Sequence, residues 1–154
     1  MRQLLLLSFT IFTIAVQAQN ANQRVEHFNI ENGVALQGYD AVSYFTQSKA
    51  QKGKKQWAVK HQGITYYFAN SQNKELFLKN PKAYEPQYGG WCAFAMGDYN
   101  KKVEVNPETF KIVDGKLYLF YNAFLTNTLN SWNKNEDVLK KQADLNWNQT
   151  LNTK

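Results

Sequence analysis

The sequence predicts one compact α+β domain: a small antiparallel sheet of hairpins packed with short helices, followed by an amphipathic C-terminal helical segment. Residues 56–68 alternate apolar and polar around Gln62-Gly63, which is typical of a hairpin. A second hairpin is predicted at Asp114-Gly115, between two apolar runs. The C-terminal helical segment, with a break at 133–135, has an apolar stripe made of Leu125, Leu129, Trp132, Leu139, Ala143 and Trp147.

The chain is expected to begin with a cleaved signal peptide. Residues 1–18 combine a short basic start, an apolar run and a Val16-Gln17-Ala18 site of the kind that signal peptidase cleaves. The apolar run is shorter than the roughly 20 residues that a membrane span needs. We therefore expect a secreted or periplasmic protein, here called the mature chain (residues 19–154), with no membrane span after cleavage.

Local signals predict the remaining elements in chain order. Residues 25–30 are expected to be a short strand or extended. A helix capped by Ser71 should end at Asn80-Pro81, because a residue before proline avoids the helical region. A short buried helix is predicted at about 91–96, ended by Gly97. No internal repeat or second domain is evident.

Composition limits the classes of partner. The formal charge of +6 falls to +5 when Arg2 leaves with the signal peptide, and an exported address argues against nucleic acid. Partners would then be a metal ion, a small ligand or a periplasmic protein. Aromatic residues make up 15% of the chain, and tyrosine and tryptophan often place their polar tips in a cleft.

Enzyme signatures are missing, so we expect a binding module rather than an enzyme. The chain has no His-Glu-x-x-His, phosphate loop, G-x-S-x-G or C-x-x-C motif. Its single cysteine, Cys92, lies at the predicted start of a helix, and Met96 lies one turn later. Thiolate and thioether suit a soft metal such as Cu(I), with His61 as a further candidate ligand.

Other interpretations of these residues stay open. Cys92 and Met96 are equally consistent with core packing, and a lone thiol in an oxidising compartment can form an intermolecular disulfide. A thiol-dependent enzyme or redox protein is the least favoured alternative. His61 is also consistent with a solvent-exposed turn residue.

A metal-free alternative uses aromatic residues beside glycines. Tyr39 and Asp40 follow Gly38, and Tyr88 and Trp91 flank Gly89-Gly90. These four residues could line a cleft for a small ligand or a partner chain. A turn with a buried tyrosine explains Tyr39 and Asp40 equally well.

Several segments in fixed order resemble the YHS domain family, and in particular its secreted bacterial subgroup. They are Gly38–Phe45 (GYDAVSYF), Gly63–Ser71 (GITYYFANS), Phe77–Tyr84, Pro86–Ala93 (PQYGGWCA) and Val113–Leu119 (VDGKLYL). The resemblance covers residues 38–121 and implies a YHS-like domain there. With the signal peptide at 1–18, the chain would then have an N-terminal extension at 19–37 and a C-terminal helical extension of the same domain at 122–154.

The resemblance also implies a metal-associated module, with copper as the expected ion. The family carries soft ligands, cysteine or histidine, at positions that correspond here to Ser43, Ala69 and Asn73. None of these three side chains is a soft ligand, so only Cys92 remains as a thiol. The expected function is an exported YHS-like module that binds a soft metal, or a metal-free module with an aromatic-lined cleft.

Overall fold

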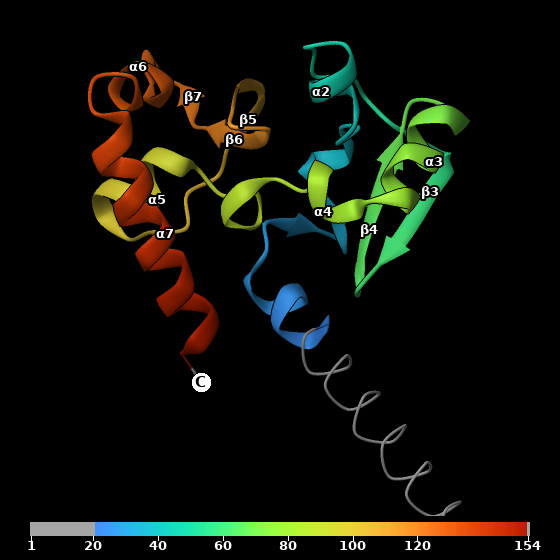
Figure 1. The fold of residues 1–154 in the computed structure, drawn as a ribbon, viewed down its shortest axis with the longest axis horizontal. Coiled ribbons are helices and arrows are strands. Elements are labelled where there is room, and N and C mark those ends of the chain that lie inside the picture. The colour runs from blue at the N-terminus through green and yellow to red at the C-terminus, as the bar shows by residue number, and fades with distance from the viewer. Residues whose placement is uncertain (1–20, 154) are drawn as a thin grey trace, which may run out of the picture.

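The computed structural model describes residues 21–153, and the predicted signal peptide lies outside this range. The elements form two halves joined along the middle of the molecule (Figure 1). One half carries the larger sheet, and the other is built from helices around a second hairpin. The α+β class predicted from the sequence is confirmed.

The larger sheet has four strands in the order β1-β2-β4-β3. Residues 21–27 form a helix before it, so the prediction of extended chain from residue 25 is wrong up to residue 27. Strands β1 (Ile30–Glu31) and β2 (Val34–Ala35) form a short antiparallel pair. Strand β2 pairs in parallel with β4 through Val34 and Thr65, which is the exception to the predicted antiparallel pattern.

Strands β3 (Lys54–His61) and β4 (Ile64–Phe68) form the predicted first hairpin. Its turn residues Gln62 and Gly63 have φ values of 45° and 86°, as a two-residue hairpin turn requires. Side chains of β4 alternate between buried and half-buried, which places Ile64, Tyr66 and Phe68 in the core.

Short helices cover this sheet. After the 3-10 turn η1 (Leu36–Gly38) comes α2 (Ser43–Thr46), and α3 (Ser71–Lys79) and α4 (Pro81–Tyr84) follow β4. The N-cap of α3 is Asn70, whose side chain accepts from the Asn73 amide, and not Ser71 as predicted. Pro81 ends α3 as predicted, since α4 starts at that proline.

The segment after α4 differs from its prediction. The 3-10 turn η2 (Gln87–Gly90) precedes α5 (Ala93–Tyr99), which begins two residues later than predicted and continues through Gly97. Asn100, in the left-handed conformation, ends the helix instead. Gly97 lets α5 pack closely against the neighbouring helix α7, because a Cβ at this position would lie 2.6 Å from the carbonyl oxygen of Leu139.

The second predicted hairpin is present as β5 (Asn106–Val113) and β6 (Lys116–Phe120), turning at Asp114-Gly115. A third, unpredicted hairpin follows as β7 (Asn122–Ala123) and β8 (Thr126–Asn127). It removes Leu125 from the predicted helical stripe. Helices α6 (Thr128–Trp132) and α7 (Glu136–Asn152) then form the C-terminal segment, with the predicted break between them.

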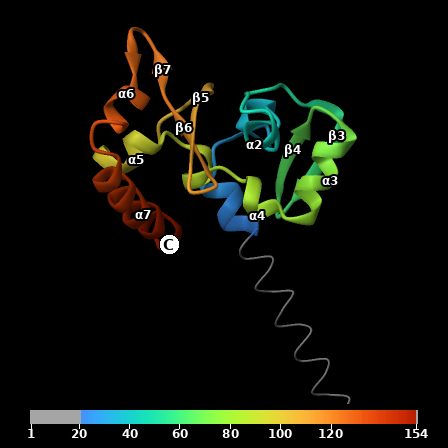
Figure 2. The same ribbon diagram turned by 45° about the horizontal axis from the view of Figure 1, so that its top comes forward.

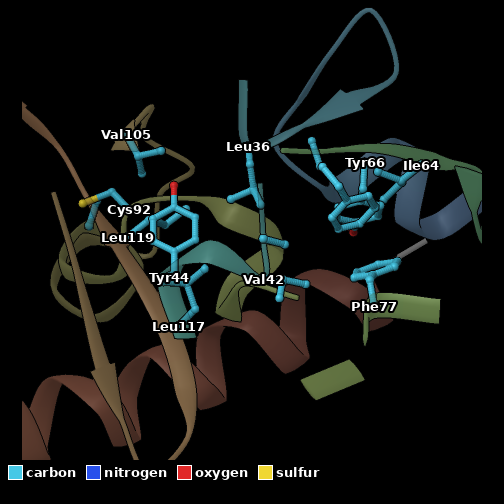
Figure 3. Packing of buried hydrophobic residues seen from close by; sticks show 14 residues of the cluster. Leu36, Val42, Tyr44, Ile64, Tyr66, Phe77, Cys92, Val105, Leu117 and Leu119 are labelled. Carbon is cyan, nitrogen blue, oxygen red and sulfur yellow. The ribbon is translucent and has the colours of Figure 1, made fainter. Parts of the chain in front are cut away.

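Two adjoining hydrophobic clusters hold the halves together. The first unites the large sheet, α2 and α3 with one side of the β5–β6 hairpin, and Figure 3 shows Tyr44 and Val42 between Leu117 and the Tyr66–Phe77 pair. The second lies between η2, α5, β6, α6 and α7, with Trp132 fully buried. Of the C-terminal stripe, Leu139 and Ala143 are buried in this cluster.

Within residues 21–153, no helix combines the length and the apolar character that crossing a membrane requires.

Candidate functional site

Asp40, a predicted cleft residue, lies inside the fold with 0% of its surface exposed. One carboxylate oxygen accepts from the backbone amides of Val42 (2.8 Å) and Ser43 (3.3 Å). The other accepts from the Ala69 amide (2.8 Å) and from Asn73 Nδ2 (2.6 Å). A ligand at the surface cannot reach this carboxylate, which joins the start of α2 to the start of α3.

The same network answers whether the metal implied by the YHS resemblance fits this chain. Ser43, Ala69 and Asn73, the positions of the family's soft ligands, all hydrogen-bond to Asp40, so the fold brings them together. All three are buried, and they present an hydroxyl, a methyl group and an amide. Both oxygens of Asp40 already accept two bonds each. The residues present do not fit a soft metal at this place.

Cys92 is fully buried and precedes α5 as its N-cap residue, rather than lying in the first turn as predicted. In Figure 3 its sulfur points away from Tyr44 and the labelled core. The Tyr121 amide donates to it at 3.4 Å, and Thr128 Oγ1 lies 3.4 Å away. Its polar neighbours are therefore an amide and a hydroxyl, and neither is a soft ligand.

The other two predicted metal ligands lie elsewhere. The Met96 backbone amide donates to the Cys92 carbonyl, but the two side chains lie in different clusters. Cys92 packs in the first cluster and Met96 in the second. His61 ends β3, with its ring 5.9 Å from that of Phe77. Among residues 21–153, no three His, Cys, Asp or Glu side chains are grouped to hold a metal ion.

Two of the predicted cleft aromatics are separate from one another. Tyr39 donates to Glu108 at 3.2 Å, and the Lys52 ammonium lies 4.0 Å from the centre of its ring. Trp91 donates from Nε1 to the His27 carbonyl at 2.7 Å, which anchors η2 to the N-terminal segment. The Trp91 amide donates to the Tyr88 carbonyl at 3.1 Å, but neither Tyr39 nor Trp91 lines the cleft that Tyr88 lines.

Tyr88 lines a cleft between the two halves of the molecule, with a volume of about 360 Å³. Helix α4 and η2 form one wall, α7 forms the other, and β6 contributes its first residue. The side chains combine three aromatic rings with charged and amide groups, and the lining residues are Phe28, Lys82, Glu85, Pro86, Gln87, Tyr88, Gly89, Lys116, Asp144, Trp147 and Asn148.

Tyr88 is fixed in the cleft by an unusual backbone conformation. Its φ of 54° is left-handed, which is uncommon for a bulky side chain and is often found at functional sites. The phenol donates to the Asp144 carboxylate at 3.0 Å. Burial, together with the charge of Asp144, raises the pKa of Tyr88 well above its ordinary value. Tyr88 therefore stays protonated and links η2 to α7.

Gly89 allows the aromatic walls to approach the backbone. Its φ is +60°, and a Cβ at this position would lie 2.8 Å from the Trp147 ring and 2.9 Å from the Phe28 ring. The two rings are 5.8 Å apart between centroids. Any larger residue at position 89 would displace these rings, so the glycine shapes the cleft.

The charges of the cleft are unevenly paired. Glu85 forms an ion pair with Arg24 and accepts from Tyr66 Oη at 2.7 Å, and Asp144 accepts from Tyr88. Lys82 and Lys116 are exposed and have no ion-pair or side-chain hydrogen-bond partner among residues 21–153. Asp144 keeps its negative charge, because the Tyr88 phenol is neutral and bonds to only one of its oxygens. Among the described residues the cleft therefore carries two ammonium groups without an ion pair against one such carboxylate.

The fold and this cleft describe a small α+β protein with a polar, aromatic-walled cavity between its halves. Comparison of the chain with protein-family models, curated proteins and solved structures finds no match. The YHS resemblance therefore rests on the sequence motifs alone.

Most of the cleft was missed by the sequence analysis. Tyr88 was predicted, but Phe28 was assigned to a strand and Trp147 to the apolar face of a helix. Lys82, Lys116 and Asp144 are ordinary surface charges in the sequence, and only the tertiary fold brings them together. The Gly89-Gly90 pair was the available signal, because adjacent glycines often mark a close backbone approach.

Proposed function

We propose that this protein is an exported YHS-like binding module that takes a small organic anion in the cleft at Tyr88, without a metal. The observation that carries the proposal is the cleft itself, about 360 Å³ in volume, which is lined by aromatic rings and by two lysines that have no ion-pair partner within residues 21–153. Pockets for small ligands have about this size, and they combine apolar walls with a few polar groups.

The charges favour an anion over a cation. Arg24 neutralises Glu85, which leaves Lys82 and Lys116 against the single carboxylate of Asp144, so the cleft carries a net positive charge. An anion would gain a partner in Lys82 or Lys116, whereas a cation would be repelled by both. The rings of Phe28 and Trp147 would contact a flat apolar part of the same ligand.

The proposal is tested by titrating the mature chain with three probes. Phenylacetate carries both a ring and a carboxylate, acetate lacks the ring, and phenylethylamine carries the ring with the opposite charge. Isothermal calorimetry measures their affinities, and a change in tryptophan fluorescence that is lost in Trp147→Phe reports on the cleft. We expect phenylacetate to bind with a dissociation constant of ~1 mM, as suits a fragment of this size, and the other two more weakly.

Matched lysine variants locate the binding. Lys116→Gln should weaken phenylacetate binding by ~2- to 5-fold, because an exposed ion pair contributes up to ~1 kcal/mol. Lys134→Gln removes an exposed lysine that does not line the cleft and should leave the affinity unchanged. Equal affinity for phenylacetate and phenylethylamine, or equal effects of the two variants, would contradict the proposal.

The arrangement of side chains supports copper binding less well than it supports anion binding in the cleft. Its family positions carry no soft donor, and Cys92 has neither Met96 nor His61 among its polar neighbours. A copper site on Cys92 would need its remaining ligands from a partner. The metal-free module is accordingly the function that we propose.

A further inference from the structure

The tip of the β7–β8 hairpin is the most exposed apolar feature of the described chain. Phe124 and Leu125 are 92% and 109% exposed relative to a reference residue, and Figure 2 shows the hairpin projecting beyond the rest of the fold. Both have positive φ, 49° and 67°. Asn-Gly is the favoured pair in such turns, and bulky L-residues are strained there. Neither residue belongs to the two hydrophobic clusters formed by residues 21–153.

An apolar pocket of about 290 Å³ lies beside the base of the same hairpin. Cys92 lies in its floor, Tyr99 is 56% exposed at its edge, and Thr126 of strand β8 completes the rim. An apolar cavity of ~150 Å³ is enough to bind benzene in another protein, so this pocket can hold a phenyl ring with room to spare.

We propose that the tip and the pocket belong to one interface, in which Phe124 of each copy of the chain inserts into the pocket of a second copy. The tip cannot fill its own pocket, because Thr126 at the rim directly follows the turn and the hairpin extends outward. A two-fold axis lets both insertions form at once, as in an isologous dimer. This inference is independent of the ligand cleft at Tyr88.

The size of the contact sets its strength. An aromatic side chain buries ~150–250 Å². Two inserted tips with their pocket walls therefore stay below the ~1,200 Å² of a standard stable interface. The dimer should be weak and reversible, and it should become evident at high micromolar concentration.

Sedimentation velocity of the mature chain over ~10 µM to 1 mM tests the inference. The variant F124N/L125G keeps a favourable two-residue turn while removing both apolar side chains, so it should fold and remain monomeric. Ser131→Phe fills the pocket from α6 and should have the same effect. Each variant should weaken association at least ~30-fold, as expected for loss of a central anchor.

A complementation experiment distinguishes specific insertion of Phe124 into the pocket from non-specific hydrophobic association. A mixture of F124N/L125G and Ser131→Phe retains one intact tip and one intact pocket, so it should associate while each variant alone does not. Leu78→Ser removes an exposed leucine on α3 and should not change association. The inference would be overturned by any of three results. The wild-type chain could stay monomeric at 1 mM, the Ser131→Phe variant could still dimerise, or the tip of a monomeric chain could bind phosphatidylcholine vesicles.

Discussion

Replacing Asp40 by asparagine should destabilise the fold strongly, because the carboxylate accepts hydrogen bonds on both oxygens. In asparagine one of these positions becomes an NH₂ group, which faces two N–H donors instead of accepting from them. If the NH₂ group faces Val42 and Ser43, both of their bonds are lost. If it faces Ala69 and Asn73, Asn73 can turn its own amide oxygen to accept, but the bond from Ala69 is lost and the remaining bonds no longer have a charged acceptor. A hydrogen bond to a charged group contributes about 1.5–3 kcal/mol, so the loss amounts to about 3–5 kcal/mol after local relaxation.

Urea unfolding followed by tryptophan fluorescence measures this loss. With a slope of about 2 kcal/mol per molar, the midpoint of Asp40→Asn should fall by ~2 M with the slope unchanged. Asp137→Asn, on the exposed first turn of α7, is the control and should cost no more than about 1 kcal/mol. A midpoint for Asp40→Asn within 0.5 M (roughly 1 kcal/mol) of the wild type would refute the structural role of this carboxylate.

Three further predictions concern the glycines, the tyrosines and the cysteine. Gly89→Ala should lose about 2–4 kcal/mol in urea unfolding and Gly115→Ala only about 1, because both have positive φ but only Gly89 faces nearby rings; equal losses would contradict the packing argument. Burial raises the pKa of Tyr44 and Tyr66, so stability is complete below the unfolded value of about 10 and lost above it. By pH 11 the two should cost about 3 kcal/mol together, measured as the fall in the urea midpoint between pH 9 and pH 11; an equal fall in the double variant Tyr44→Phe/Tyr66→Phe would refute this. Cu(I) titration should give the same stoichiometry for wild type and Cys92→Ala, and a loss of one equivalent would restore the metal hypothesis.

The regular elements could be predicted because their signals are local. Alternating apolar residues around Gln62-Gly63 and Asp114-Gly115 define hairpins within a dozen residues, and Pro81 ends a helix whatever surrounds it. The β7–β8 hairpin could not be predicted in this way, because Phe124 and Leu125 occupy turn positions that normally carry asparagine and glycine. Leu125 was therefore assigned from the sequence to the apolar stripe of the C-terminal helical segment.

The candidate site depends on contacts between residues that are far apart in the sequence, so most of it could not be predicted from local sequence patterns. Asp40 looked like a cleft residue because it follows Gly38-Tyr39, yet its partners Ala69 and Asn73 lie about thirty residues away and enclose it. Tyr88, which the sequence analysis named beside Gly89-Gly90, lines the cleft. Its neighbour Trp147 is separated from it by most of the second half of the chain, and no local pattern connects them.

The central claim is that the cleft at Tyr88 binds a small organic anion, and NMR mapping tests it most directly. Amide chemical shifts of the ¹⁵N-labelled mature chain are followed while phenylacetate is added. The account predicts shifts confined to the cleft, at Phe28, residues 82–89, Lys116 and residues 144–148. Shifts centred on the pocket of Cys92 and Thr128, or no saturable shifts at all, would contradict it.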